Sequence, residues 1–299
     1  MSKGYGMAVA GLTLTTLFWA VNAIVGRAVV GDIPPLTLAF WRWTTAALIL
    51  LPLAWSGAKQ HWPQIRQQWP WLLLLSILSV TAYNTILYVA VQTTTAINTS
   101  LMNTLIPLST LLMAWVILGS RPLPLQWLGM LLGAAGMLLV ISRGDVQVLT
   151  QLAFTQGDLW MLLAVGCWAL YSVLLRKRSL LLPPLVLLGV MVWLGLPWLA
   201  LMFLWEWGQG QLMQVHWGSV GVILYTGIFP SVLAYLFWNH GVAMLGPGIA
   251  SLFIFLMPVF GSVLATWLLG EAFEFYHAIG GAFILLGLVA GVQAQRVTK

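Results

Sequence analysis

Ten long apolar stretches occupy almost the whole sequence, and they constrain its fold more than any other feature. By residue number they run over 7–30, 34–54, 69–91, 96–119, 124–142, 157–176, 183–205, 216–242, 247–270 and 274–294. A helix needs about 20 apolar residues to cross the hydrocarbon core of a bilayer. Only 6% of the residues are charged, which is too few to cover a soluble surface. We therefore predict an all-α integral membrane protein with ten transmembrane helices. The first stretch is too long for a removable signal peptide and lacks a small-residue cleavage site, so it counts as a helix.

Charged residues are distributed unevenly over the joints between these stretches. If the amino terminus is cytoplasmic, nine of the twelve basic residues fall on the inner side and all six acidic residues on the outer side. The nine are Lys3, Lys59, Arg66, Arg121, Arg176, Lys177, Arg178, Arg296 and Lys299. Basic residues concentrate in cytoplasmic loops, so we predict a protein of the cytoplasmic (inner) membrane with both termini cytoplasmic. Because the basic residues form no stripe, nucleic acid is not an expected partner.

A repeated motif divides the sequence into two related halves. The motif SLMNTLIP at residues 100–107 recurs as SLFIFLMP at 251–258. Nearer the start of each half, IPPLTL at 33–38 resembles LPPLVL at 182–187. The order and spacing of these pairs indicate a duplicated five-helix unit.

This duplication predicts how the chain is organised. We expect a single membrane domain, 1–299, with a first five-helix repeat at 7–142 and a second at 157–294. Because five is an odd number, the second repeat must cross the membrane in the opposite sense. Inverted-topology repeats of this kind build many secondary transporters that work by alternating access.

Each copy of the motif ends in a proline, Pro107 or Pro258, near the middle of its helix. Proline removes a backbone hydrogen bond and bends a helix. Bends at mirrored positions of two inverted halves predict a pair of hinges for the gates of a transporter. The alternative is a static kink that improves helix packing.

The ends of the two halves carry a family resemblance. The sequences LGSRPLPLQWLGMLLGAAGMLLV and LGEAFEFYHAIGGAFILLGLV, with a proline in the fourth helix of each half, resemble the EamA-type drug/metabolite transporter superfamily. Within it, the ten-helix, tryptophan-rich chain is most similar to YddG-type exporters of aromatic and neutral amino acids. The resemblance covers nearly the whole chain and implies amino-acid export. One departure is Ser120 where the second half has Glu271, so any role of that acid has no counterpart in the first half.

Polar and aromatic residues gather on one face of several predicted helices. Polar groups inside a membrane need partners or a water-filled cavity. We predict a substrate cavity lined by Trp19, Asn22, Tyr83, Asn84, Tyr88, Ser100, Asn103, Trp168, Tyr171, Tyr235, Trp238 and Asn239. This set is neutral, aromatic and rich in amides, which suits an uncharged or zwitterionic ligand with an apolar side chain. For each residue alone, the alternative is an interhelical hydrogen bond or simple packing.

The middle of the spans contains few titratable groups. Asp, Glu and Lys, which proton-driven carriers use as relays, are absent there. We therefore predict uncoupled facilitated diffusion of a neutral bulky amino acid or similar metabolite. His240 could titrate near neutrality, with an interfacial, solvated histidine as the alternative. Arg42 could meet a substrate carboxylate, but we expect its long side chain to extend to the outer interface.

Other functional classes remain as alternatives. One is a drug or nucleoside exporter of the same superfamily, with or without proton coupling. The sequence lacks HExxH, GxSxG and phosphate-loop motifs, so an enzyme within the membrane is a remote alternative. The single cysteine, Cys167, excludes an intramolecular disulfide, and we predict no metal site and no cofactor. The expected partners are a small-molecule substrate and the lipid bilayer.

Glycines recur at short spacings on the predicted fifth and tenth helices. They are Gly129, Gly133 and Gly136 on one, and Gly287 and Gly291 on the other. Small residues at such spacings permit close approach of two helices. We expect packing within a monomer, and a dimer surface is the alternative.

Overall fold

The computed structural model describes residues 3–28, 31–177, 182–269 and 272–297. Within them, ten helices are long and apolar enough to cross a membrane, which confirms the predicted number of spans. The helical elements are α1 (Lys3–Ala28), α2 (Pro35–Gln60), α3 (Trp62–Ser76), α4 (Asn84–Ala90), α5 (Ala96–Asn103), α6 (Leu105–Leu118), α7 (Pro124–Ile141), α8 (Val146–Thr150), α9 (Gln156–Lys177), α10 (Pro184–Gly208), α11 (Trp217–Gly227), α12 (Ala234–Leu245), α13 (Pro247–Leu252), α14 (Leu256–Leu269) and α15 (Phe275–Val297). Arg178, Glu271 and Lys299 lie outside the described residues.

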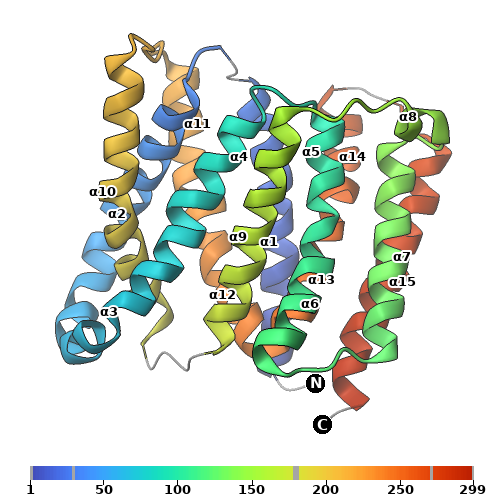
Figure 1. Ribbon diagram of the computed structural model, residues 1–299, viewed down its shortest axis with the longest axis horizontal. Helices are drawn as coiled ribbons and strands as arrows, with labels where there is room; N and C mark the ends of the chain where they lie inside the picture. Colours follow the sequence, from blue (N-terminus) through green and yellow to red (C-terminus); the bar gives the residue numbers. More distant parts are fainter. Residues whose placement is uncertain (1–2, 29–30, 178–181, 270–271, 298–299) are drawn as a thin grey trace.

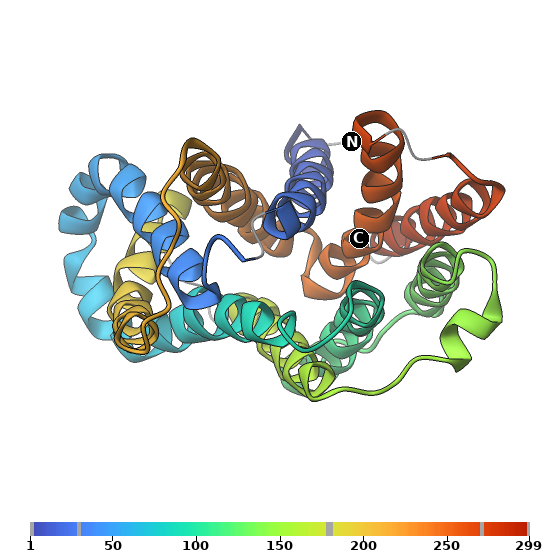
Figure 2. The same cartoon turned by 90° about the horizontal axis from the view of Figure 1, so that it is seen from above.

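The spans stand side by side, and both termini lie at the same end of the bundle (Figure 1). The short helix α8 lies at the opposite end, which we call the α8 end; the end with the termini is the terminal end. Seen along the helices, the bundle is elongated, with α2, α3 and α10 at one extreme and α7 and α15 at the other (Figure 2). Helix α1 lies between these extremes and packs against α12 and α14.

Helices α2 and α3 extend farther than the hydrophobic pattern predicts. We expected the second span to end at residue 54 and the third to begin at 69. Instead, α2 continues to Gln60 and α3 begins at Trp62, so that only His61 separates them. The added turns carry polar residues such as Lys59 and Arg66. A helix satisfies its own backbone hydrogen bonds, so it can continue beyond the apolar core, and hydropathy therefore does not mark its ends.

Two spans are interrupted four residues before their prolines. Helix α5 ends at Asn103 and α6 begins at Leu105, and a 3₁₀ turn at Phe253–Phe255 separates α13 from α14. Proline cannot bond the carbonyl four residues before it, and its ring crowds that carbonyl. For Pro107 and Pro258 these carbonyls belong to Asn103 and Ile254, which lie at the interruptions. The mirrored prolines thus lie at corresponding positions just after mirrored interruptions in the two halves, whereas α10 stays continuous around Pro197.

The third and eighth spans each contain a π-helical segment: Ile77–Tyr83 and Ile228–Leu233. A π-helical turn disturbs the regular backbone ladder and leaves carbonyl groups accessible to other donors. The Ser79 carbonyl accepts a hydrogen bond from the hydroxyl of Tyr235 in the second half (2.8 Å). The Pro230 carbonyl accepts one from Nε1 of Trp19 in the first half (3.2 Å). Side chains of each half therefore reach into the π-helical segment of the other.

The glycines of the fifth and tenth spans, α7 and α15, face each other within the chain. A Cβ added at Gly287 would lie 2.6 Å from the carbonyl oxygen of Gly129, and one added at Gly280 would lie 2.7 Å from that of Gly136. Real Cβ contacts are not this short. Only glycine therefore permits this backbone-to-backbone approach, which places α7 and α15 side by side at one extreme of the bundle (Figures 1 and 2).

Candidate functional site

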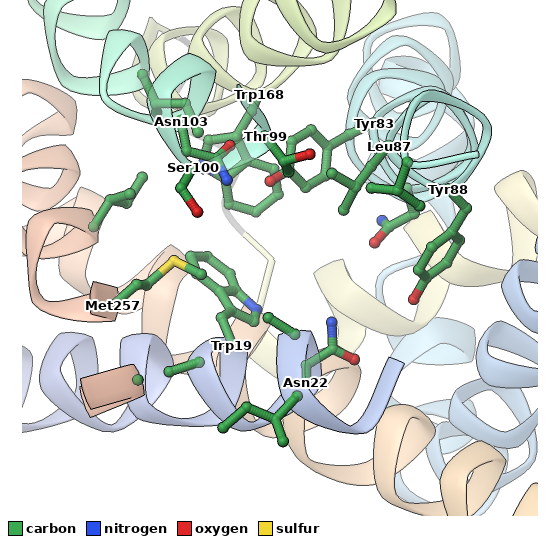
Figure 3. A pocket seen from close by; sticks show the side chains of 18 of the residues that line it. Trp19, Asn22, Tyr83, Leu87, Tyr88, Thr99, Ser100, Asn103, Trp168 and Met257 are labelled. Carbon is green, nitrogen blue, oxygen red and sulfur yellow. The ribbon is translucent and has the colours of Figure 1, made fainter. Parts of the chain in front are cut away.

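A cavity of about 470 Å³ lies between the two halves. Its wall includes mid-span residues such as Trp168 and Tyr235. It also includes Ile33 and Gln92, which lie in the connections at the α8 end. The cavity therefore extends from the middle of the bundle toward the α8 end, and Figure 3 shows its side chains.

Nine of the twelve residues expected in a cavity lie on this wall. They are Trp19, Asn22, Tyr83, Asn84, Tyr88, Ser100, Asn103, Trp168 and Tyr235. In Figure 3, the polar ends of Asn22 and Tyr88 point toward the same part of the cavity from different helices. The hinge candidate Pro258 also lines the cavity, whereas Pro107 is buried outside the wall.

The structure places the other three residues behind the cavity, on the side of the terminal end. Tyr171, Trp238 and Asn239 are buried and do not line it. The Tyr171 hydroxyl donates to Asn239 Oδ1 at 2.5 Å, and Trp238 Nε1 donates to Ser172 Oγ at 3.2 Å. They share helix faces with cavity residues, but tight packing of the spans encloses them. The sequence analysis expected these three residues to line the cavity, whereas in the structure they belong to the packed region between the cavity and the terminal end.

Trp168 forms the floor of the cavity together with the rings around it. Its ring centroid lies 5.1 Å from that of Trp19, 4.8 Å from Tyr83 and 5.3 Å from Trp238. Tilted and edge-to-face contacts of this kind are favourable beyond simple burial. The floor is therefore a rigid aromatic surface against which an apolar side chain could pack.

Three polar atoms of the wall have no hydrogen-bond partner among the described residues. They are Asn22 Oδ1, Asn103 Oδ1 and Trp168 Nε1. Asn84, by contrast, donates to the Ser79 carbonyl at 2.8 Å. Buried polar atoms are ordinarily paired, and these three have almost no accessible surface, so they would gain partners only through a change in the packing around them.

Arg42 lies on the wall of the cavity and does not extend to the membrane interface. Its side chain is 2% exposed. Nε donates to Ser231 Oγ at 2.5 Å, and the two terminal nitrogens donate to the Tyr88 hydroxyl at 2.8 Å and the Pro230 carbonyl at 3.3 Å. Our expectation of an outward extension is therefore wrong. Acceptors at membrane depth hold the side chain, and two of them come from the second half of the chain.

One sequence signal could have indicated this position. Pro35, Leu38 and Arg42 follow one another at i, i+3 and i+7, which places them on one face of a helix, and all three line the cavity. The apolar wall residues Ile106, Met137 and Met257 were also missed. Nothing in an apolar sequence distinguishes a residue that lines a cavity from one that faces lipid or another helix.

A buried carboxylate fixes the connection between α4 and α5 beside the cavity. Asp158, at the start of α9, is fully buried. It accepts hydrogen bonds from the Thr94 hydroxyl at 2.5 Å, the Asn98 amide at 2.8 Å and the backbone nitrogen of Thr155 at 2.7 Å. Since Thr94 lines the cavity, Asp158 holds part of its wall without facing it.

A second buried carboxylate caps α2 on the same side. Glu206, near the end of α10, is 2% exposed and accepts hydrogen bonds from the backbone nitrogens of Leu36 (3.0 Å) and Thr37 (2.6 Å). A negative charge at a helix N-terminus is favourable because the first N–H groups lack partners within the helix. Neither Glu206 nor the coupling candidate His240 lines the cavity.

Ten spans in two related halves, with a cavity between the halves that extends toward one end, are the architecture of a secondary transporter. The sequence model of the EamA-like transporter family matches residues 6–142 and again residues 155–291. The chain therefore belongs to the EamA-like transporter family, as the sequence resemblance implied. The two matches fall on the two halves, so each half carries the family pattern.

Individual relatives agree with this assignment. The uncharacterized transporter YyaM of Bacillus subtilis is 28% identical over 286 residues, which cover 95% of this chain and 93% of YyaM. An uncharacterized transporter of Archaeoglobus fulgidus is also 28% identical, over 93% of this chain and 94% of its own. The chloroplastic WAT1-related protein At3g02690 of Arabidopsis thaliana is 27% identical, over 91% of this chain and 66% of its own.

A solved crystal structure shares the fold. It has a TM-score of 0.76 at 21% sequence identity and is matched over 98% of this chain and 99% of its own length. The family assignment and the relatives named as transporters identify the chain as a multi-pass membrane transporter of small molecules rather than an enzyme.

Proposed function

We propose that the protein exports neutral, bulky amino acids, aromatic or aliphatic, or similar metabolites by alternating access. The observation that carries this proposal is the cavity, whose wall combines aromatic rings with the amide residues Asn22, Asn84 and Asn103. Its volume of about 470 Å³ falls in the range of about 300–1,000 Å³ typical of small-molecule sites. An apolar side chain would pack on the floor, and the polar wall would bind the polar end of the molecule.

The proposed orientation places both termini in the cytoplasm and the α8 end outside the cytoplasmic membrane. The distribution of basic residues supports it. In this orientation the cavity extends outward, and Tyr171, Trp238 and Asn239 belong to the closed inner side. Export would then require an inward-facing state, in which the inner side opens and the outer side closes. We favour a monomer, because the glycine faces of α7 and α15 are already used within the chain.

The proposed transport is uncoupled facilitated diffusion. Among the described residues, no Asp, Glu or His side chain lines the cavity. Asp158 and Glu206 are occupied by hydrogen bonds at helix ends. A proton relay through the binding site therefore has no group to carry it.

Counterflow in proteoliposomes tests the function directly. Vesicles preloaded with an unlabelled aromatic or aliphatic amino acid are expected to accumulate the labelled compound transiently, with or without an imposed pH gradient. A transport rate that rises with the gradient would contradict the uncoupled mechanism. Counterflow of nucleosides or hydrophobic drugs, without counterflow of amino acids, would support the alternative substrate classes instead.

The mirrored prolines are proposed as hinges of the two gates. The double variant Pro107→Ala/Pro258→Ala restores continuous helices in both halves and is expected to slow counterflow by roughly tenfold or more, because gate motion limits many carriers and enzymes. The matched control is Pro197→Ala, since Pro197 is exposed within the uninterrupted helix α10. Unchanged rates in the double variant would leave the prolines as static kinks.

A further inference from the structure

The charge of Arg42 is not balanced by any acidic side chain of the described residues. Among these residues, the contact between a basic and an acidic side chain joins His216 Nε2 to an Asp32 carboxylate oxygen at 3.3 Å, in connections at the α8 end. Asp158 and Glu206 are bonded to other partners, as described above. The three acceptors of Arg42 are a serine hydroxyl, a tyrosine hydroxyl and a backbone carbonyl, all of them neutral. The cavity wall therefore carries one buried positive charge.

A buried charge without a counter-ion is costly in a medium of low dielectric constant. An anion that enters the cavity would reduce this cost and would be attracted more strongly than in water. Residues that are costly at membrane depth commonly mark a substrate pathway. Arg42 therefore distinguishes between classes of ligand, because it favours anionic groups and disfavours cations.

The guanidinium also has hydrogen-bonding capacity left. It carries five N–H donors, and Ser231, Tyr88 and Pro230 take three of them. One N–H remains on each terminal nitrogen. Two donors on a planar fork match the two oxygens of a carboxylate. The three neutral acceptors fix the orientation of this fork on the wall.

We propose that Arg42 is the carboxylate-binding group of the cavity, and that the substrates are therefore compounds with a free carboxylate next to an apolar group. This inference rests on the proposed transport function and narrows its substrate class. The amide group of Asn22 lines the cavity from another helix and points toward the same part of it as Tyr88 (Figure 3), to which Arg42 donates, so the ammonium group of a ligand held by Arg42 would meet this amide. An α-amino acid presents both groups, so its zwitterion matches the wall, whereas a nucleoside or a cationic drug does not.

The test compares three compounds that differ in one charged group. Phenylalanine, its carboxamide and 3-phenylpropionate are offered as competitors of phenylalanine counterflow in wild-type proteoliposomes. The amide is expected to compete about 10- to 100-fold more weakly than the amino acid, because a charge-assisted bond is lost, whereas the acid retains measurable competition. Equal competition by the amide and the amino acid would overturn the role of Arg42 while leaving amino-acid transport intact.

A second arm changes the protein. Arg42→Met is expected to lose the preference for amino acid over amide, and Arg42→Lys to retain part of it. Arg176→Met is the matched control, since Arg176 also bonds a backbone carbonyl, that of Ala243, but lies away from the cavity. Thermal unfolding of each purified variant shows whether it is folded. If Arg42→Met is not folded, the comparison of the three competitors on the wild-type protein remains decisive.

Two further outcomes separate this inference from the proposed function. Binding of 3-phenylpropionate that depends on Arg42, without counterflow of any amino acid, would uphold the carboxylate site and reject the amino-acid exporter. Chloride or phosphate could also occupy a cationic site. If these ions compete in wild type but not in Arg42→Met, while amino acid and amide bind equally, the site is an inorganic-anion site and the proposal is overturned.

Discussion

Gly287→Val is expected to lower the thermal unfolding temperature sharply and to reduce the yield of folded protein. A Cβ at this position would lie 2.6 Å from the Gly129 carbonyl oxygen and 2.8 Å from the Gly133 backbone nitrogen. Both neighbours are backbone atoms, so relief requires α7 and α15 to separate along much of their shared face. Overpacking costs up to about 3 kcal/mol or more where side chains cannot adjust, and here the obstacle is a whole helix.

The matched control for this prediction is Gly166→Ala in α9. A Cβ there would meet nothing within 4 Å, and alanine is a better helix former than glycine by about 1 kcal/mol. We expect the control to unfold at the wild-type temperature or above it, measured by the temperature dependence of the monodisperse peak in size-exclusion chromatography. A Gly287→Val variant as stable as the control would contradict the glycine interface.

The second large effect is expected for Asp158→Ala, which removes the acceptor shared by Thr94, Asn98 and Thr155. Four donor groups at the α8 end, two of them on Thr155, would lose a charged partner, at a cost of about 3 kcal/mol in the free energy of unfolding. The connection before α5 would also loosen, and because Thr94 lines the cavity, substrate binding should weaken as well. Asp158→Asn retains one acceptor oxygen and should fall between wild type and the alanine variant.

Asp145→Ala provides the comparison for Asp158→Ala. Asp145 is exposed and caps the short helix α8 by accepting one hydrogen bond, from the backbone nitrogen of Gln147 at 2.8 Å. Loss of an exposed cap costs about 1 kcal/mol. Equal losses of stability and of substrate binding in the two variants would show that Asp158 acts only as a helix cap.

Hydropathy and the position of polar groups predicted most of the architecture and much of the cavity wall. Ten spans could be counted because each needs a run of apolar residues, and Asn22, Asn84 and Asn103 could be named because amides are rare at membrane depth. The end of α2 at Gln60 and the start of α3 at Trp62 could not be predicted, since a helix needs no apolar side chains to continue into the interface.

The environment of Arg42 could not be predicted because it depends on atoms from another part of the chain. Its carbonyl acceptor belongs to Pro230, in a π-helical segment that no sequence pattern predicted. The prediction that Tyr171 and Asn239 line the cavity differs from the structure for a related reason. Their helix faces are those of cavity residues, but whether such a face borders the cavity or is enclosed depends on helix packing rather than on sequence spacing.

The hydrogen bonds that each half donates to the π-helical segment of the other have a consequence for biosynthesis. The first five helices leave the ribosome and enter the membrane before Tyr235, Pro230 and Ser231 have been made. During that interval the Ser79 carbonyl lacks Tyr235, and the guanidinium of Arg42 lacks two of its three acceptors. The first half alone therefore lacks hydrogen-bond partners for these polar groups, and it gains them only when the second half has been made and inserted. Two fragments divided at the central connection would have to be produced together in the same membrane to give a stable transporter.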